Sequence, residues 1–250
     1  VQDLTAFLAG RLDVAGAVAP AAELGTLVAG MHAAFATAWA GCPVPVTHAT
    51  PADATYWLDR ALRTVDEAQT VTVAAAGDRF RRRADLARAV IGRGLAAAAG
   101  TATIRIHDDL HVGQVLRWDG GYAVSDFDGN PVLPAAERDL PQPPARDVAG
   151  MLRALDHVGR IVDRRTDQAV ADRVRDWTRR VREAFLASYR AGLAAAGADG
   201  LFDEALLPAF EVEQECRELL YAARHLPRWT YVPDAALADL LPVPGEDVDG

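Results

Sequence analysis

The sequence predicts a mainly α-helical protein of the α+β class, with one short β-hairpin. Apolar residues recur at the three- and four-residue spacing of amphipathic helices along most of the 250 residues. Only the stretch that follows Gly100 changes to short apolar runs around a turn signal. Half of the residues are hydrophobic, which is enough to bury one substantial core or two modest ones, and no repeat or linker divides the chain.

Three helices are expected in residues 1–100. Apolar side chains at helical spacing mark residues 21–40, and the prolines of the following "CPVPVTHATP" end this helix. Residues 52–68 form the second helix, and residues 79–99 form the third. The third helix opens with the basic run "RFRRR", which is either a phosphate-binding patch or a solvated helix face; we favour the solvated face.

A β region and further helices follow. "TATIRI" and "GYAVSDF" alternate or run apolar over short lengths, and "RWDGG" between them is typical of a hairpin turn. Helical patterns resume over residues 146–165, from 167 to about 196, and over 203–225, where Asp203 is the expected N-cap. A short amphipathic turn and the acidic tail "PGEDVDG" complete the chain.

Composition excludes several classes of protein. The net charge of −9 argues against nonspecific binding to nucleic acid or to anionic lipid. No apolar run approaches the roughly 18 residues of a membrane span, and the first residues lack the pattern of a signal peptide. Cys42 and Cys216 lie far apart without CxxC spacing, so we expect neither a zinc site nor a disulfide framework, and a cytoplasmic location.

Four carboxylates are crowded into the β region. Asp108, Asp109, Asp126 and Asp128 lie in one short segment, and like charges so close repel one another unless a cation lies among them. A metal ion, or a phosphate group held through one, removes that conflict. An Asp-rich surface hairpin that serves solubility explains any one of these residues, but not their ordered pattern with His and Gln between two strands.

That pattern is the layout of kinase-type phosphoryl-transfer enzymes. His107, Asp109 and Gln114 form H-x-D-x-x-x-x-Q after one apolar strand, and a second strand delivers "DFDG" from Asp126. In such enzymes one Asp orients the substrate hydroxyl or accepts its proton, an amide five residues later holds a metal, and a further Asp completes the metal site. The Asp126 carboxylate and the Gln114 carbonyl suit Mg²⁺, which prefers oxygen ligands. We therefore predict Mg²⁺ and ATP chemistry.

At these residues the chain resembles the aminoglycoside-phosphotransferase-like kinases. Actinobacterial maltokinases of this group typically show H-G-D-x-H-x-G-Q and then D-F-E-G-E-P, where this sequence has "HDDLHVGQ" and "DFDGNP". The ending "NPV" and the downstream "QECRELLYAARHLPRWTYVP" are similar to the glucosamine kinase branch, so the resemblance covers most of residues 101–242. It implies the C-terminal lobe of a protein-kinase-like fold, whose small β-hairpin carries the catalytic and metal loops.

The resemblance also implies a role for each motif residue. Asp109 is the catalytic aspartate, and Gln114 and Asp126 are metal ligands with Asp128 as a second metal contact. A kinase of this type needs an N-terminal lobe with a small β-sheet, a glycine-rich loop and usually a lysine. This sequence shows none of the three, and all 26 of its basic residues are Arg. We therefore expect the N-terminal lobe of the same parent chain as a partner.

Two residues, His107 and Asp147, are expected to support the catalytic loop, and His111 is a candidate sugar contact. Asp108 departs from the family. His107 organises the loop backbone, while His111 either reaches the sugar or supports the loop. Asp147 opens a later helix and is structural, through N-capping or by bracing the loop. Asp108 replaces the family glycine; protein kinases place Arg there, so a side chain fits, but a second carboxylate beside the base lowers activity if it points inward.

A second polar cluster lies near the C-terminal end. One stripe of the helix over residues 203–225 contains Gln214, Arg217, Glu218, Tyr221, Arg224 and His225. A solvated face gives the same periodicity, but Trp229 just beyond it favours an amino-sugar site, since a ring stacks on the pyranose and a carboxylate pairs with its ammonium. By resemblance to glucosamine kinases, Glu218 and Trp229 contact the substrate, with Arg224 and Tyr221 behind them.

The sequence therefore predicts ATP-dependent phosphorylation of D-glucosamine to glucosamine 6-phosphate. Within one lobe we expect a helical segment (1–100), the catalytic and metal hairpin (101–135) and a helical acceptor-sugar segment (136–250). A maltokinase or another small-molecule kinase of the same fold is the alternative, and it does not require Glu218. A catalytically impaired homologue that serves as a binding or regulatory module is a third, supported by Asp108 and by the missing lobe.

Overall fold

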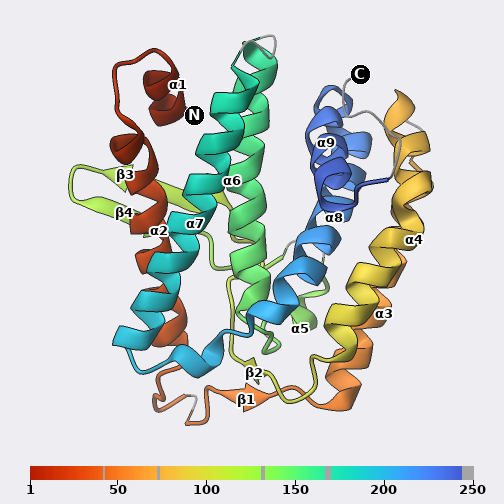
Figure 1. The fold of residues 1–250 in the computed structure, drawn as a ribbon. Coiled ribbons are helices and arrows are strands. Elements are labelled where there is room, and N and C mark those ends of the chain that lie inside the picture. The colour runs from red at the N-terminus through yellow and green to blue at the C-terminus, as the bar shows by residue number, and fades with distance from the viewer. Residues whose placement is uncertain (42, 72–73, 131–132, 167–169, 244–250) are drawn as a thin grey trace. The chain divides into compact units, whose positions relative to one another are not determined.

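The computed structural model describes residues 1–250 except 42, 72–73, 131–132, 167–169 and 244–250, so the predicted acidic tail lies outside the described residues. The chain is mainly helical with few strands, as predicted (Figure 1). It forms two compact units, each built from two chain segments. Unit 1 combines Val1–Thr47 with Ala102–Asp203, and unit 2 combines His48–Thr101 with Glu204–Gly250. These units do not follow the linear segments 1–100, 101–135 and 136–250.

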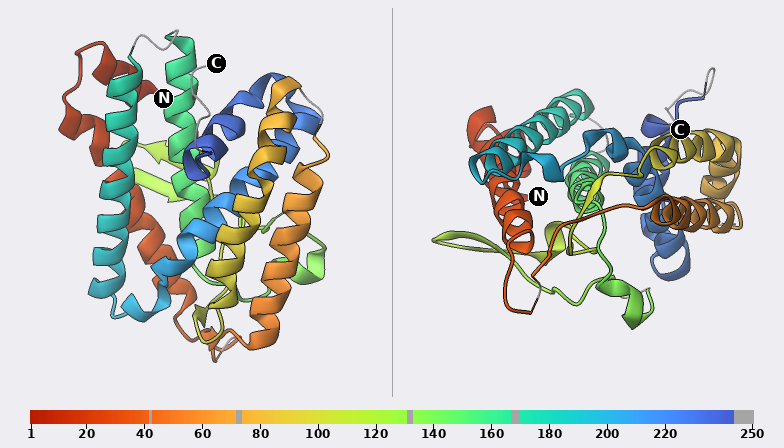
Figure 2. Two further views of the ribbon diagram at one scale, coloured as in Figure 1. Left: turned by 45° about the vertical axis from the view of Figure 1, so that its right-hand side comes forward. Right: turned by 90° about the horizontal axis from the view of Figure 1, so that it is seen from below.

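Unit 1 carries the β-hairpin and five of the α-helices among the described residues. Its elements are α1 (Gln2–Leu8), α2 (Val14–Phe35), β2 (Ala102–Thr103), η1 (Val112–Gln114), β3 (Val115–Trp118), β4 (Gly121–Val124), α5 (Ala135–Arg138), α6 (Ala145–Arg165), α7 (Ala171–Ala195) and η2 (Asp199–Leu201). The short strand β1 (Thr47–His48) lies at the boundary of the units. Helices α2, α6 and α7 lie side by side in both views (Figures 1 and 2).

Helix α2 packs closely along α7 because glycines stand at the crossing points. A Cβ atom on Gly25 would lie 2.3 Å from the carbonyl oxygen of Phe185, and one on Gly192 would lie 2.6 Å from the Cβ of Ala29. The helix begins at Val14 rather than at residue 21, because the Asp13 carboxylate caps it by accepting a hydrogen bond from the Gly16 amide at 2.8 Å. It ends at Phe35, before the predicted residue 40.

Among the described residues, α2 is long and apolar enough to cross a membrane by length and composition alone. This corrects the expectation that no stretch reaches that length, because its many alanines raise the mean hydropathy of the window to 1.4. The signal is weak, since core helices of soluble proteins pass the same test. In this structure the α2 face toward α7 is buried, with Leu24, Val28 and His32 at or near zero exposure.

Unit 2 is a group of helices. Its elements are α3 (Pro51–Ala68), α4 (Ala74–Ala96), η3 (Glu204–Leu206), α8 (Leu207–His225), η4 (Pro227–Trp229) and α9 (Tyr231–Leu240). Helix α3 follows the prediction closely, because Thr50 and Asp53 form a capping box at its start. Helix α4 begins five positions earlier than predicted, at Ala74. Helix α8 packs against both α3 and α4 (Figure 1).

The basic run of α4 is only partly the solvated face that we predicted. Arg79 pairs with Asp234 of α9, and Arg81 pairs with Asp78 one turn earlier. Arg83 is buried, and its guanidinium donates to the Arg79 carbonyl. Arg79 and Arg83 therefore take part in the packing of unit 2 rather than in a solvated face.

Two local predictions are corrected. Helix α8 starts at Leu207, and its N-cap is Leu206 without a side-chain bond, so Asp203 is not the cap. Pro208 explains this start, since proline is favoured in the first helical turn. The strand partner of β4 is β3 (Val115–Trp118), not "TATIRI", because the two-residue Asp-Gly turn pairs the segments immediately beside it.

Candidate functional site

The loop from Ile104 to Leu110 is held in place by buried anchors in unit 1. Ile104 exchanges two backbone hydrogen bonds with Gln142, at 3.1 and 2.8 Å. The side chains of Ile104, Ile106 and Leu110 are buried. Helix α6 comes close to the loop at Gly150, where a Cβ atom would lie 2.7 Å from the Leu110 carbonyl oxygen. The polar residues between these anchors therefore project from a fixed backbone.

The carboxylate of Asp147 binds the backbone of this loop. It accepts the amide of His107 at 2.7 Å on Oδ2 and the amide of Asp108 at 2.8 Å on Oδ1. Asp147 lies in the first turn of α6, but the N-cap there is Pro144 without a side-chain bond, so its carboxylate serves the loop instead of its own helix. Asp147 is buried, and hydrogen bonds between a buried carboxylate and amides are among the stronger ones.

Asp108 occupies a left-handed backbone conformation, with φ of 62°. This explains why a glycine is the residue typical of that position in the kinases the sequence resembles, since glycine adopts positive φ without steric cost. Asp tolerates this region better than most other side chains. Its side chain is buried, and its amide is one of the two that donate to Asp147. The backbone shape of the loop is thus compatible with the substitution.

His107 joins the two motif blocks. Its Nε2–H donates to the Ser125 carbonyl at 2.9 Å, and the Asp109 amide donates to its Nδ1 at 3.4 Å. The Phe127 ring lies against the His107 ring, with centroids 5.1 Å apart, and against Phe35 of α2 at 6.0 Å. The imidazole therefore links the backbone at Asp109 to the strand end that precedes Asp126.

Gln114 and Asp126 are brought into contact. The Gln114 side-chain amide donates to Asp126 Oδ2 at 3.0 Å. The backbone carbonyl of Gln114 accepts the Ser125 amide at 2.9 Å and the Ser125 hydroxyl at 3.1 Å. Asp126 has a φ of 64°, so the chain bends as it leaves β4. An amide oxygen and a carboxylate next to each other fit Mg²⁺, which is typically held by one or two protein oxygens together with phosphates and water.

The remaining predicted residues of this loop are placed as follows. His111 is half-buried, and its Nδ1 accepts the Gly113 amide at 3.0 Å, which caps η1. Asp109 is half-buried, and Asp128 is exposed. In the part of the chain that the structure describes, no group of three or more His, Cys, Asp or Glu side chains gathers as a metal cluster.

Two residues behind the loop were missed by the sequence analysis. His32 of α2 lies 3.2 Å from Asp147 Oδ2 through its Nε2, and 2.8 Å from the Tyr189 hydroxyl through its Nδ1. Both rings are fully buried. The signal for them was available: each polar group falls on the apolar face of its helix, four residues after Val28 and Phe185 respectively.

The predicted sugar contacts on and after α8 belong to unit 2, whereas His111 belongs to unit 1. Glu218 is half-buried and accepts a hydrogen bond from the Gln214 amide at 3.0 Å. Among the described residues, no basic side chain lies within ion-pair distance of its carboxylate. Arg224 pairs with Glu67 of α3 at 3.1 Å, with both side chains more than half exposed. Glu218 is thus a carboxylate to which a cationic ligand can bind.

Aromatic side chains surround the end of α8. Tyr221 is exposed, and its ring lies 4.9 Å from that of His225. Trp229 is 39% exposed and stacks nearly parallel on Tyr231, at 6.3 Å and 20°. The residues of this group expose flat apolar rings, which is the kind of surface on which a pyranose stacks.

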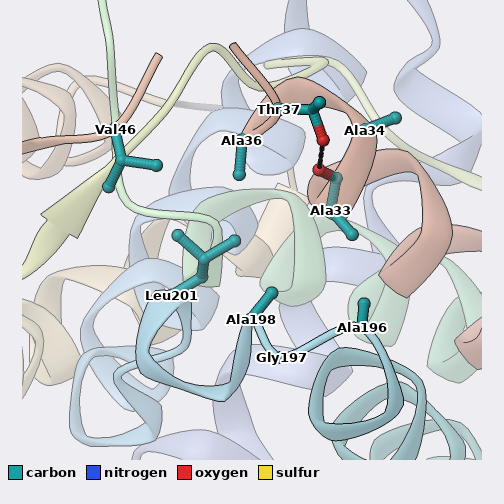
Figure 3. Close-up of a pocket in the computed structure, with 9 residues that line it drawn as sticks. All are labelled: Ala33, Ala34, Ala36, Thr37, Val46, Ala196, Gly197, Ala198 and Leu201. Carbon is teal, nitrogen blue, oxygen red and sulfur yellow. Dashed lines mark hydrogen bonds between the residues drawn. The ribbon is translucent and has the colours of Figure 1, made fainter. Parts of the chain in front are cut away.

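One pocket lies elsewhere in unit 1, where the C-terminal ends of α2 and α7 meet (Figure 3). Its volume is about 410 Å³. It is lined by Ala33, Ala34, Ala36, Thr37, Val46, Ala196, Gly197, Ala198 and Leu201. The Thr37 hydroxyl donates to the Ala33 carbonyl at 2.9 Å, and none of the predicted site residues lines the pocket. With no charged side chain in its lining, this pocket does not fit a phosphorylated ligand.

Comparison with known proteins shows what this arrangement resembles. No protein-family model matches the sequence. The chain is 48% identical over 242 residues to a glucosamine kinase of Streptacidiphilus jiangxiensis, covering 97% of this chain and 54% of that protein. It is 44% identical over 231 residues to a glucosamine kinase of Mycolicibacterium smegmatis, covering 92% of this chain and 56% of that protein.

Solved structures give the same result. A glucosamine kinase in complex with glucosamine, ADP and inorganic phosphate superposes with a TM-score of 0.89 at 48% identity, over 96% of this chain and 56% of that one. A crystal form of glucosamine kinase gives a TM-score of 0.90 over 97% of this chain and 56% of that one. The mainly helical fold is thus similar to part of a phosphotransferase structure, and the chain has glucosamine kinase homologues over nearly all of its length. It spans about half the length of the relatives that it matches.

Proposed function

We propose that the protein carrying this chain phosphorylates D-glucosamine with ATP, giving glucosamine 6-phosphate and ADP. The observation that carries the proposal is the contact between the two motif blocks: Gln114 and Asp126 meet at 3.0 Å, directly after a loop whose backbone His107 and Asp147 hold. The similarity to glucosamine kinases supports the same reaction. In this proposal residues 1–250 supply the C-terminal lobe of a kinase-like, cytoplasmic enzyme, and the N-terminal lobe of the same parent chain completes the ATP site.

Asp109 is the catalytic residue of the proposal. Its carboxylate accepts the hydrogen bond of the sugar 6-hydroxyl, which orients O6 toward the γ-phosphorus. As the O6–phosphorus bond forms, the bond from that phosphorus to the β–γ bridging oxygen breaks, ADP leaves, and the hydroxyl proton passes to the carboxylate. The Asp109 amide donates to His107 Nδ1, which ties the backbone that carries the carboxylate to the rest of the loop.

Gln114 and Asp126 are the proposed metal ligands, with Asp128 as a second metal contact. Mg²⁺ held there would neutralise the charge that develops on the phosphate oxygens. The hydrogen bond between Gln114 and Asp126 orients both side chains. His111 caps η1, so we assign it to loop support rather than to sugar binding.

Glu218 and Trp229 are the proposed selectivity residues for the amino sugar. The Glu218 carboxylate is half-buried and has no cationic neighbour at ion-pair distance among the described residues, which leaves it available to the glucosamine ammonium. Trp229, stacked on Tyr231, offers its ring to the pyranose. Tyr221 and Arg224 lie on α8 with Glu218, and Arg224 forms an ion pair with Glu67.

The test is a phosphorylation assay of the full-length protein with Mg²⁺-ATP and glucosamine, glucose, N-acetylglucosamine or maltose. We expect turnover of glucosamine that Asp109→Asn abolishes. Glu218→Gln should lower kcat/KM for glucosamine about a hundredfold, because the hydrogen bond between two charged groups is worth about 3 kcal/mol, and should leave any turnover of glucose unchanged. Glu183→Gln, an exposed acid on α7, is the matched control and should change neither.

Two outcomes would overturn the assignment. Turnover of maltose instead of glucosamine would make the protein a maltokinase and Glu218 an ordinary surface acid. No turnover of any sugar, with Mg²⁺-ATP still bound, would indicate a module that binds without transferring phosphate.

A further inference from the structure

We propose that His32 and Tyr189 are positioning residues of the catalytic loop, acting through Asp147. The inference rests on the proposed function, because it concerns the loop that carries Asp109. It assigns a catalytic effect to two residues that lie 115 and 42 positions away from Asp147 in the sequence, on α2 and α7. Neither residue reaches the substrate in this proposal; both act on the carboxylate that holds the loop.

The first support is how the Asp147 carboxylate is shared. Its Oδ2 receives two donors, the His107 amide at 2.7 Å and His32 Nε2 at 3.2 Å, while Oδ1 receives the Asp108 amide at 2.8 Å. A carboxylate with only the two amide donors could still rotate about its last torsion, because that torsion is soft. The third donor comes from another helix and fixes the plane of the carboxylate, so both loop amides meet their acceptors together.

The second support is the direction of the hydrogen bonds. Burial raises the pKa of the Tyr189 phenol, and the negative charge of Asp147 raises it further, so the hydroxyl keeps its proton. A carboxylate can only accept, so His32 donates to Asp147 through Nε2–H, and the Tyr189 hydroxyl lies at hydrogen-bond distance from the other ring nitrogen, 2.8 Å from Nδ1. Tyr189 thus holds the His32 ring in the orientation that turns Nε2 toward the carboxylate.

The third support is that both rings are held by packing. The Tyr189 ring stacks on Phe185 at 6.2 Å and 4° and meets Phe202 edge-on at 5.0 Å. The His32 and Tyr189 rings meet edge-to-face at 5.7 Å. Both are fully buried, so a polar pair here carries a desolvation cost that an apolar pair would not. A polar pair at this depth is consistent with a role beyond filling the core.

His32 and Tyr189 act on the part of the loop where the backbone takes a left-handed conformation. Asp108 sits at φ 62°, and its amide is one of the two that Asp147 holds. Asp109 follows directly, so any rotation of the Asp108 peptide moves the Asp109 carboxylate. A shift of about 1 Å at a reacting group can cost on the order of a hundredfold in rate. Loss of the His32 donor should therefore lower kcat more than it changes substrate affinity.

The test uses three variants in the full-length protein. Tyr189→Phe removes only the hydroxyl, His32→Leu removes the donor to Asp147, and His32→Gln restores an N–H at similar reach. Val181→Ala is the control, because it makes a cavity in the buried face of α7, the helix of Tyr189, without touching the hydrogen bonds of His32, Tyr189 and Asp147. For each we would measure kcat, both KM values, the melting temperature, and amide hydrogen exchange in a peptide covering residues 104–114.

We expect kcat to fall about tenfold in Tyr189→Phe and about a hundredfold in His32→Leu, with KM for glucosamine and for ATP within about twofold of the wild type. His32→Gln should recover part of the loss, and the double variant should be no slower than His32→Leu alone. Exchange of the 104–114 peptide should accelerate in both Tyr189→Phe and His32→Leu. Val181→Ala should lower the melting temperature and leave kcat and loop exchange unchanged.

The proposal is overturned if kcat and loop exchange stay at wild-type values in Tyr189→Phe and His32→Leu. It is also overturned if Val181→Ala lowers kcat as much as they do, because stability alone would then explain the effect. Should the wild-type protein not phosphorylate glucosamine at all, the proposed function fails and loop exchange decides by itself: faster exchange in the two variants supports the positioning role, and unchanged exchange refutes it.

Discussion

Replacement of Gly25 by Ala should destabilise the protein, although the same change elsewhere in α2 should stabilise it. A Cβ atom at Gly25 would lie 2.3 Å from the Phe185 carbonyl oxygen and 3.0 Å from the Tyr189 amide nitrogen. Both atoms belong to the α7 backbone, which cannot swing aside as a flexible side chain would. Ordinary contact needs about 3.5 Å, so α2 and α7 would have to separate by roughly 1 Å.

The size of the effect follows from two opposing terms. Overpacking a well-packed contact costs about 1–3 kcal/mol, and a backbone neighbour places Gly25→Ala near 3 kcal/mol. Ala is favoured over Gly within a helix by about 1 kcal/mol, which leaves a net loss of about 2 kcal/mol. At Gly30, on the exposed face of the same helix, nothing lies within 4 Å of the added Cβ, so only the helix preference remains and Gly30→Ala should gain about 0.5–1 kcal/mol.

Thermal unfolding of the two variants, followed by circular dichroism, checks the difference in sign. A loss of 2 kcal/mol corresponds to a decrease in Tm of about 4–8 °C, and the gain at Gly30 to an increase of about 1–4 °C. Gly30→Ala is the matched control, because it makes the same chemical change in the same helix. If both variants shifted Tm in the same direction, the close approach of α2 and α7 would not be what requires glycine at position 25.

Two further predictions concern buried titratable groups. Burial opposes ionisation of Asp156, but the charges of Arg160 and Arg153 outweigh it and hold the pKa of Asp156 below its ordinary value. The interaction of Asp156 with these two arginines therefore stabilises the fold above pH about 4. This contribution is lost as pH falls through the lowered pKa. Asp156→Asn should therefore cost about 3 kcal/mol at pH 7 in urea denaturation, with a difference from the wild type that shrinks below pH 4; a difference constant with pH would refute the pairing. Burial, with the charges of Glu215 and Glu213, raises the pKa of the Cys216 thiol, so in a Cys42→Ser background iodoacetamide should leave the native protein unmodified at pH 8 by intact mass. Alkylation at the rate of a free thiol would show that Cys216 is accessible.

Local sequence signals predicted most of the helices. The apolar pattern placed the start of α3 within one residue of Pro51, where the capping box of Thr50 and Asp53 fixes it locally. Errors occurred where another signal competed. Asp13 began α2 earlier than the apolar pattern indicated, and Pro208 moved the start of α8 beyond Asp203. The hairpin was predicted from its Asp-Gly turn, but the wrong strand was paired, since alternation alone does not choose between neighbouring segments.

The candidate site also has a part that the sequence predicts and a part that depends on the fold. The residue types and their order, from His107 to Gln114 and then "DFDG", are written in the sequence, and they were enough to predict kinase chemistry. The contact between Gln114 and Asp126 depends on the path of β3 and β4, which strand pairing decides.

By itself, the sequence determined the chemical groups of this protein and the helices that carry them, because helix periodicity, caps and motif spacing act over a few residues. Only the tertiary structure decided that Asp147 turns its carboxylate to the loop that precedes Asp109 rather than to its own helix, and that His32 and Tyr189 lie behind it. These partners come from three helices that are separated in the chain by up to 157 positions. The burial that makes their hydrogen bonds strong exists only after α2, α6 and α7 have packed together.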